Sequence, residues 1–195
     1  MTALLFDLYG VILKHRTEAG KRRLEQAAGV IDSELFWTTY NELRPAYLVG
    51  DVSDQRWWQQ MALRANLNDP DIAEAIVADS ETLMDVDQDM VDLVLKLIDE
   101  GYTCGILSNA PESVSTMLRE RHEWLAQLDA VTFSCDIGVA KPDPRAFAVA
   151  VDAMGANIKD TIFFDDSPDN VAAAEKAGLQ AHLFTSMKDV HDLQL

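Results

Sequence analysis

The chain begins with a short apolar run, Ala3–Phe6, which ends abruptly in a carboxylate, Asp7, and then in Gly10. The run is too short to span a membrane and too apolar for a surface strand. We therefore expect a central strand that is buried on both faces, as in a parallel sheet. Asp7 then lies at the carboxyl end of the strand, where open α/β sheets bind ligands, and Gly10 lets the backbone approach such a ligand. Taken alone, Asp7 is explained equally well as a turn residue.

The second half of the chain alternates between helical and strand patterns, which is typical of a doubly wound parallel sheet. Short apolar runs predict further strands over residues 102–107, 131–134, 161–164 and 181–184. Apolar residues at helical spacing predict intervening helices through residues 90–98, 111–118, 144–154 and 171–178. The sequence therefore predicts an α/β fold, and the stretch after Thr185 indicates no element.

Residues 16–83 differ from the rest, because they show several helical patterns and no convincing strand. Ser33 and Ser53 each precede apolar residues at helical spacing, which favours them as N-caps. We predict a small all-helical insert here, with a Rossmann-like core formed by residues 1–15 and 84–195.

The insert is rich in aromatic residues, which favours the core of a small bundle over a cage around a ligand. Trp37, Arg44 and Tyr47 could face a substrate, but we interpret them as part of an exposed helix surface.

Length and charge limit the classes of function. A chain of 195 residues with 48% hydrophobic content can bury one good core, with or without a smaller appendage. No signal-like stretch or membrane-length apolar run is present, so we expect a soluble, cytoplasmic protein. A formal charge of −17 repels nucleic acid and anionic membranes, so we expect neither as a partner. Cys104 and Cys135 lie in apolar segments and are interpreted as inert core thiols.

Polar residues follow the predicted strands at one edge of the sheet: Asp7, Ser108, Asn109, Asp165 and Asp166, with Lys141 in a loop. Three carboxylates repel one another unless a cation lies among them, and a site of oxygen ligands alone suits Mg²⁺. Magnesium, a lysine and a Ser/Asn turn are what a phosphoryl group needs, and Asp7 is then available as a nucleophile. Taken singly, Ser108-Asn109 could simply cap a helix and Lys141 could belong to a turn.

The order of these polar residues along the chain, with their neighbours, resembles the motifs of the haloacid dehalogenase superfamily of aspartate-nucleophile hydrolases. The resemblance covers nearly the whole chain. The helical insert lies where that family places a helical cap. The four matching segments are Phe6–Val11, Leu107–Asn109, Gly138–Pro142 and Phe164–Val171.

This resemblance implies a role for each residue of the site. It makes Asp7 the nucleophile and a Mg²⁺ ligand, with Tyr9 a ligand through its backbone carbonyl. It makes Asp166 the other direct ligand, whereas Asp165 would act directly or through water. Ser108 and Asn109 would bind the phosphate, and Lys141 would hold the nucleophile and the phosphate together.

Tyr9 departs from the pattern of most phosphatases of the family, which have an aspartate there as general acid and base. The sequence Asp-Leu-Tyr-Gly is similar to that of the L-2-haloacid dehalogenases, which use no metal and attack carbon. The adjacent Asp165 and Asp166 favour a metal-dependent enzyme, because without a cation their repulsion would blunt the nucleophile. The Asp-Asp-Ser-Pro-Asp-Asn pattern also resembles phosphatases that lack the second aspartate.

We therefore predict a Mg²⁺-dependent phosphatase that hydrolyses a small phosphorylated metabolite through an aspartyl-phosphate on Asp7. One alternative is a metal-independent hydrolase similar to the L-2-haloacid dehalogenases. Another is a non-catalytic, phosphate-binding relic of the enzyme, with Tyr9 marking lost chemistry. The sequence assigns neither a particular substrate nor an oligomeric state.

Overall fold

A five-stranded sheet forms the centre of the computed structural model, which describes residues 2–191. Met1 and residues 192–195, which the predicted core includes, lie outside the described part. All the neighbouring strands are parallel, in the order β3-β2-β1-β4-β5. The strands are β1 (Ala3–Phe6), β2 (Thr103–Ser108), β3 (Ala130–Phe133), β4 (Thr161–Asp165) and β5 (Gln180–Leu183). The predicted parallel α/β fold is confirmed.

Strand β1 lies at the middle of the sheet because both of its faces are apolar. Ala3 pairs with Thr103 of β2 on one side and with Thr161 of β4 on the other. Leu4 and Phe6 pack into one hydrophobic cluster, whereas Ala3 and Leu5 pack into another. The alternation of side chains along a strand thus supplies a core on each side of the sheet.

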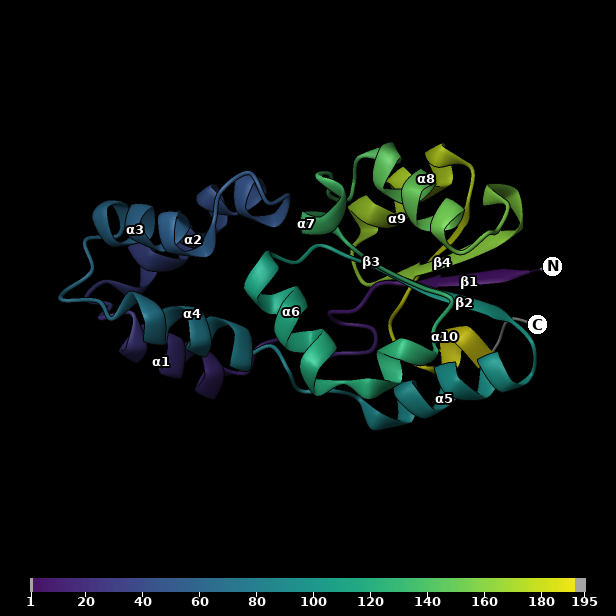
Figure 1. Ribbon diagram of the computed structural model, residues 1–195, viewed down its shortest axis with the longest axis horizontal. Helices are drawn as coiled ribbons and strands as arrows, with labels where there is room; N and C mark the ends of the chain where they lie inside the picture. The colour runs from purple at the N-terminus through teal and green to yellow at the C-terminus, as the bar shows by residue number, and fades with distance from the viewer. Residues whose placement is uncertain (1, 192–195) are drawn as a thin grey trace.

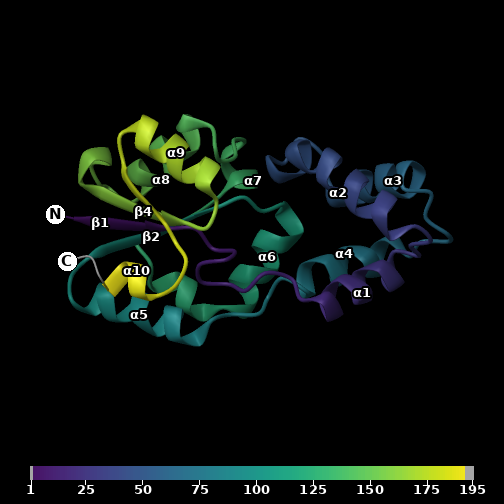
Figure 2. The ribbon, with the colours of Figure 1, turned by 180° about the vertical axis from the view of Figure 1, so that it is seen from behind.

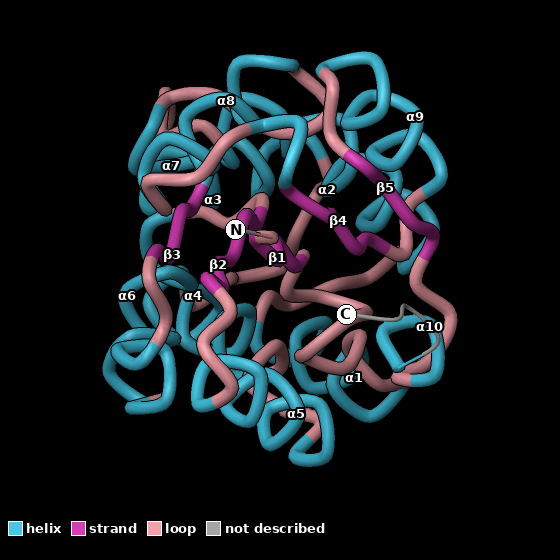
Figure 3. The backbone as a smooth tube through the Cα atoms, turned by 90° about the vertical axis from the view of Figure 1, so that its right-hand side faces the viewer, coloured by secondary structure: helices cyan, strands magenta, loops and turns pink. Residues whose placement is uncertain are grey.

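Helices cover both faces of the sheet (Figures 1 and 3). One face carries α5 (Gln88–Asp99), α6 (Glu112–Arg121), the 3₁₀ turn η1 (Glu123–Gln127) and α10 (Lys188–His191). The other carries α7 (Ser134–Ile137), α8 (Pro144–Ala153), the 3₁₀ turn η2 (Ile158–Asp160) and α9 (Pro168–Ala177). This is the doubly wound arrangement that the alternating sequence pattern predicts.

Four helices within the predicted cap lie together beyond the carboxyl ends of the strands (Figures 1 and 2). They are α1 (Glu18–Ala27), α2 (Ser33–Leu48), α3 (Asp54–Arg64) and α4 (Ile72–Glu81). Tyr47 and Trp57 stack at 4.4 Å between ring centroids, and Trp57 meets Trp58 edge to face. All three side chains are buried, as expected for the core of a small bundle. The expectation that Tyr47 is exposed is wrong, whereas the boundaries of the cap stay a prediction.

Some element ends differ from the prediction by one residue. Helix α2 is capped by Asp32 instead of Ser33, since the Asp32 side chain accepts a hydrogen bond from the backbone of Leu35. Strand β3 ends at Phe133, because Ser134 turns away to begin α7 and its hydroxyl contacts residues of two other segments. Long-range contacts of this kind are invisible to a local pattern.

The two cysteines are free thiols, as expected. Cys104 is buried, and burial raises the pKa of its thiol to about 12, which keeps the thiol protonated. Within residues 2–191, no helix has the length and apolar character needed to cross a bilayer.

Candidate active site

Three neighbouring strands bring the predicted site residues to one edge of the sheet. Asp7 directly follows β1, and its backbone N–H donates to the carbonyl of Phe164 in β4 at 2.8 Å. Ser108 is the last residue of β2, and Asp165 is the last residue of β4. Because neighbouring parallel strands end at the same edge of the sheet, these side chains meet although Asp7 is more than a hundred residues from each of the other two in the sequence.

Lys141 lies between two of the carboxylates. Its Nζ is 2.7 Å from Asp7 Oδ1 and 2.7 Å from Asp165 Oδ2, and only 1% of its side chain is exposed. A buried ammonium needs compensating charge, and here one ammonium is shared by two carboxylates. The structure thus brings Lys141 to Asp7, the residue that is predicted to be the nucleophile.

Asp165 has a different environment from Asp7. It is fully buried, and besides Lys141 its oxygens accept hydrogen bonds from the backbone of Ser167 and the side chain of Asn170. These contacts favour Asp165 as the anchor of Lys141, and a metal would have to compete with them. No role was predicted for Asn170, although it lies within the fourth motif.

The chemistry of the three carboxylates fits a hard divalent cation. One ligand oxygen from each of Asp7, Asp165 and Asp166 lies within 4.8 Å of the others. Lys141 neutralises one of the three charges, so two negative charges remain, which matches one Mg²⁺ ion.

Gly10 and His15 surround the carboxylate of Asp166. A Cβ at position 10, where φ is +82°, would lie 2.3 Å from Asp166 Oδ2, so only glycine allows this approach. His15 Nε2 lies 2.9 Å from the same oxygen. His15 was not among the predicted site residues, because the contact depends on the path of the loop after β1.

Burial dominates the electrostatics of Asp7. Desolvation raises the pKa of its carboxyl to about 6, with the charge of Asp165 adding to the rise and Lys141 opposing it. A cation among the carboxylates would favour the ionised, nucleophilic form.

The Ser108-Asn109 turn contributes two kinds of polar group. Within the described chain, the Ser108 hydroxyl is buried and has no hydrogen-bond partner, so it is available for a ligand. The side-chain amide of Asn109 is already engaged, since it donates to the carbonyl of Lys141 at 2.8 Å and accepts from its N–H at 2.9 Å. This amide therefore positions the Lys141 loop, and a phosphate contact by Asn109 would use its backbone.

A cavity of about 530 Å³ opens over these residues and is lined from both sides. Asp7, Ser108, Lys141 and Asp166 line it from the sheet edge, together with Tyr9. The facing wall comes from the helical region and the segment before it, and it includes Arg16, Lys21, Tyr40 and Arg44. Arg44 is half-buried in this wall, so the expectation of an exposed helix surface is wrong for it.

Comparisons with known proteins identify the family of the chain and support its fold. The model of the haloacid dehalogenase-like hydrolase family matches residues 1–178, so the chain belongs to this family. A had family enzyme from Bacteroides thetaiotaomicron, solved in complex with magnesium and inorganic phosphate, has a TM-score of 0.82 and 20% identity. That alignment covers all of both chains and shows a shared fold.

Relatives of known activity include phosphatases and a dehalogenase. Phosphatase MT3486 from Mycobacterium tuberculosis is 39% identical over 84 residues, which span 43% of this chain and only 39% of that protein. Sesquiterpene phosphatase astK from Aspergillus oryzae is 24% identical over 98% of this chain and 94% of its own length. (S)-2-haloacid dehalogenase 4A from Burkholderia cepacia is 24% identical over 91% of this chain and 80% of its own length.

Proposed function

We propose that this protein is a Mg²⁺-dependent phosphatase that hydrolyses a small phosphorylated metabolite through an aspartyl-phosphate on Asp7. The observation that carries the proposal is the cluster of three carboxylates with one shared lysine, whose two excess negative charges match a divalent cation. The phosphatases among its relatives, and the magnesium and phosphate bound by the similar Bacteroides enzyme, support it.

In this proposal the Asp7 carboxylate attacks phosphorus, and the ester P–O bond breaks as the alcohol departs. Water then attacks the phosphoryl group on Asp7, which releases inorganic phosphate and restores the carboxylate. Lys141 fixes the orientation of Asp7 and offsets negative charge on the phosphoryl oxygens. The unpartnered Ser108 hydroxyl donates a hydrogen bond to one of these oxygens.

Asp7, Asp166 and the backbone carbonyl of Tyr9 are the residues proposed to hold Mg²⁺, with Asp165 contributing directly or through water. When bound, the ion supplies positive charge that lowers the repulsion between the carboxylates and the anionic substrate.

The alternative of a metal-independent dehalogenase is supported by Tyr9 and by the dehalogenase relative. The charges of the site weigh against it, because Lys141 compensates only one carboxylate of the three. Without a metal, Asp166 would repel the anionic nucleophile. The alternative of a non-catalytic relic predicts binding of phosphate without turnover.

The deciding experiment measures hydrolysis of a panel of phosphate esters, acyl phosphates and 2-haloacids with Mg²⁺ and with EDTA. We expect turnover of phosphate compounds that EDTA abolishes, and loss of nearly all activity in Asp166→Asn while the fold is retained. Asp169→Asn removes a nearby carboxylate outside the cluster of three and serves as the matched control. Phosphatase activity that persists in EDTA would contradict the metal dependence, and turnover of 2-haloacids alone would favour the dehalogenase.

The covalent step has its own measurement. With a substrate that carries radioactive phosphorus, acid quenching during turnover should leave label on the wild-type protein and none on Asp7→Asn. Label found only in the released phosphate would mean that water attacks phosphorus directly.

A further inference from the structure

The cap-side wall of the cavity carries positive charge that the described chain does not neutralise. Lys141 is paired with Asp7 and Asp165, Arg16 with Asp79, and Lys21 with Glu18. Arg44 is the exception, since no carboxylate of residues 2–191 lies within ion-pair distance of its guanidinium. In a chain with 33 acidic and only 16 basic residues, an unpaired arginine inside a cavity is not explained by a shortage of partners.

A buried network fixes the place of this charge. Arg16 and the Tyr40 hydroxyl both donate to the Asp79 carboxylate, which is 2% exposed. Arg44 donates to the Tyr40 oxygen and lies over the Tyr40 ring, 5.0 Å from its centroid. The network contains Arg16, Arg44 and one carboxylate, Asp79, which pairs with Arg16, so it has one positive charge in excess.

The remaining donors of Arg44 are oriented but not satisfied by an anion. Partial burial of an unpaired guanidinium costs free energy, which an anionic ligand would offset through paired N–H···O contacts. Stacking on Tyr40 limits the rotation of the guanidinium, so less conformational entropy is lost when a ligand binds.

A second polar group of the same cavity lacks a partner. The Tyr9 hydroxyl is buried and makes no hydrogen bond to any described residue, although Tyr9 lines the cavity. Arg44 lines the same cavity from the facing wall. A phenolic O–H and a guanidinium that line one cavity can both donate to an anionic group bound there.

We propose that Arg44, assisted by the Tyr9 hydroxyl, binds a second anionic group of the substrate, either a carboxylate or a further phosphoryl group, on the part that leaves with the alcohol. This inference rests on the proposed phosphatase function and narrows its substrate class to phosphorylated compounds with two anionic groups. Asp79 acts as a positioning residue, because it holds Tyr40 and Arg16 and thereby leaves Arg44 without a carboxylate partner.

Matched substrate pairs test the proposal. In the carboxylate pair, 3-phosphoglycerate is compared with glycerol 3-phosphate, which has a hydroxymethyl group in place of the carboxylate. In the phosphoryl pair, propane-1,3-diol bisphosphate is compared with its monophosphate. In at least one pair, we expect kcat/KM to be about tenfold or more higher for the compound with two anionic groups, since charge-assisted hydrogen bonds contribute that much. The favoured pair identifies which anionic group the site takes.

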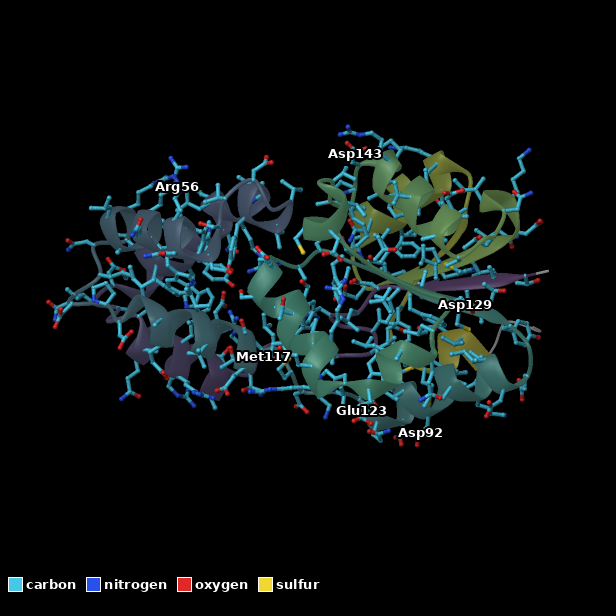
Figure 4. All side chains as sticks on the ribbon, in the orientation of Figure 1. Arg56, Asp92, Met117, Glu123, Asp129 and Asp143 are labelled. Carbon is cyan, nitrogen blue, oxygen red and sulfur yellow. The ribbon has the colours of Figure 1, made fainter. Side chains whose placement is uncertain are left out.

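Three variants separate this contact from general charge effects. Arg44→Gln should lower kcat/KM for the compound with two anionic groups more than for its partner, so that their ratio falls to about one, and Arg44→Lys should keep part of the preference. Arg56→Gln removes the same charge from α3, where Figure 4 shows Arg56 pointing away from the rest of the molecule, and should keep the full preference. The inference is overturned if wild type shows no preference in either pair, or if Arg44→Gln retains it.

A binding measurement keeps this inference separate from the phosphatase proposal. In an Asp7→Asn background with Mg²⁺, calorimetry should show that the compound with two anionic groups binds more tightly than its partner with one. Adding Arg44→Gln should remove this difference. If wild type hydrolyses no ester, the phosphatase proposal is wrong, and the binding result alone decides on Arg44. Equal affinities for both members of each pair would overturn the inference.

Discussion

At the scale of single residues, the two carboxylates that share Lys141 differ in their exposure. Asp165 is fully buried, and its oxygens accept hydrogen bonds from Lys141, Ser167 and Asn170. Asp7 receives the same ammonium but keeps 10% of its side chain exposed to the cavity. A nucleophile needs open space before it, so this difference supports the proposal that Asp7 is the nucleophile and Asp165 a supporting residue.

Asp7 gives a prediction about stability and pH. Its pKa is about 6 in the folded, metal-free protein against 3.8 as the ordinary value, so the folded state binds more protons between these limits. Stability therefore falls as the pH rises from about 4 to about 6 and stays reduced above that. In EDTA near pH 8, the free energy of unfolding of Asp7→Asn should be about 1 to 3 kcal/mol higher than that of wild type.

Denaturant titrations at several pH values measure this difference. The advantage of Asp7→Asn should disappear below about pH 4, where the wild-type carboxyl is protonated in both states. An advantage that is the same at all pH values would show that packing, and not the charge of Asp7, causes it.

Tyr9 gives a prediction about leaving groups. A phenol is a weak acid at neutral pH, and burial raises the pKa of Tyr9 further, so it is a poor proton donor. General acid assistance typically raises the rate by about 10² to 10⁴. Without it, aryl and acyl phosphates should react much faster than phosphates whose alkyl group is uncharged. Tyr9→Phe should leave this ratio unchanged, and Tyr9→Asp should raise the alkyl rate selectively. If Tyr9→Phe abolishes only the alkyl rate, the phenol is the acid.

At the scale of elements, Asp54 at the start of α3 joins helices of the cap to the core. Its Oδ1 accepts from the hydroxyl of Tyr47 in α2 and, at 2.7 Å, from that of Ser113 in α6. Asp54→Ala should lower the free energy of unfolding by about 1 to 3 kcal/mol, because two hydroxyls lose a charged partner. Hydrogen exchange in α2 and α3 should become faster.

Asp51→Ala is the matched control, since this carboxylate is exposed on the preceding turn. It should change neither stability nor exchange by a measurable amount. Equal effects of the two variants would contradict a specific link through Asp54.

The same elements show what a local pattern can and cannot predict. Strand β1 is predicted to the residue, because its apolar run and the following carboxylate are both local signals. The environment of Arg44 is not predicted by a local pattern. Arg44 and Tyr47 lie one helical turn apart on α2, yet Tyr47 packs against Trp57, whereas Arg44 lines the cavity. Only the packing of α2 against α3 and the sheet edge decides between these two environments.

At the scale of the whole molecule, the candidate site is assembled from segments spread over most of the chain. The residues around Asp7, Ser108, Lys141 and Asp165 were found by their motifs, since each follows a strand or begins a loop of recognisable composition. The wall that carries Arg16 and Arg44 has no such motif. Its contribution appears only when the helical region is placed over the carboxyl ends of the strands (Figure 1).

The central position of β1 also fixes an order of events during synthesis. The ribosome makes Ala3–Phe6 first, but the neighbours of this strand are Thr103–Ser108 and Thr161–Asp165. At roughly 5 to 20 residues per second, the second neighbour emerges about ten to thirty seconds later. Asp7 can share Lys141 with Asp165 only after β4 has been translated, so the nascent chain cannot assemble the proposed site before that point.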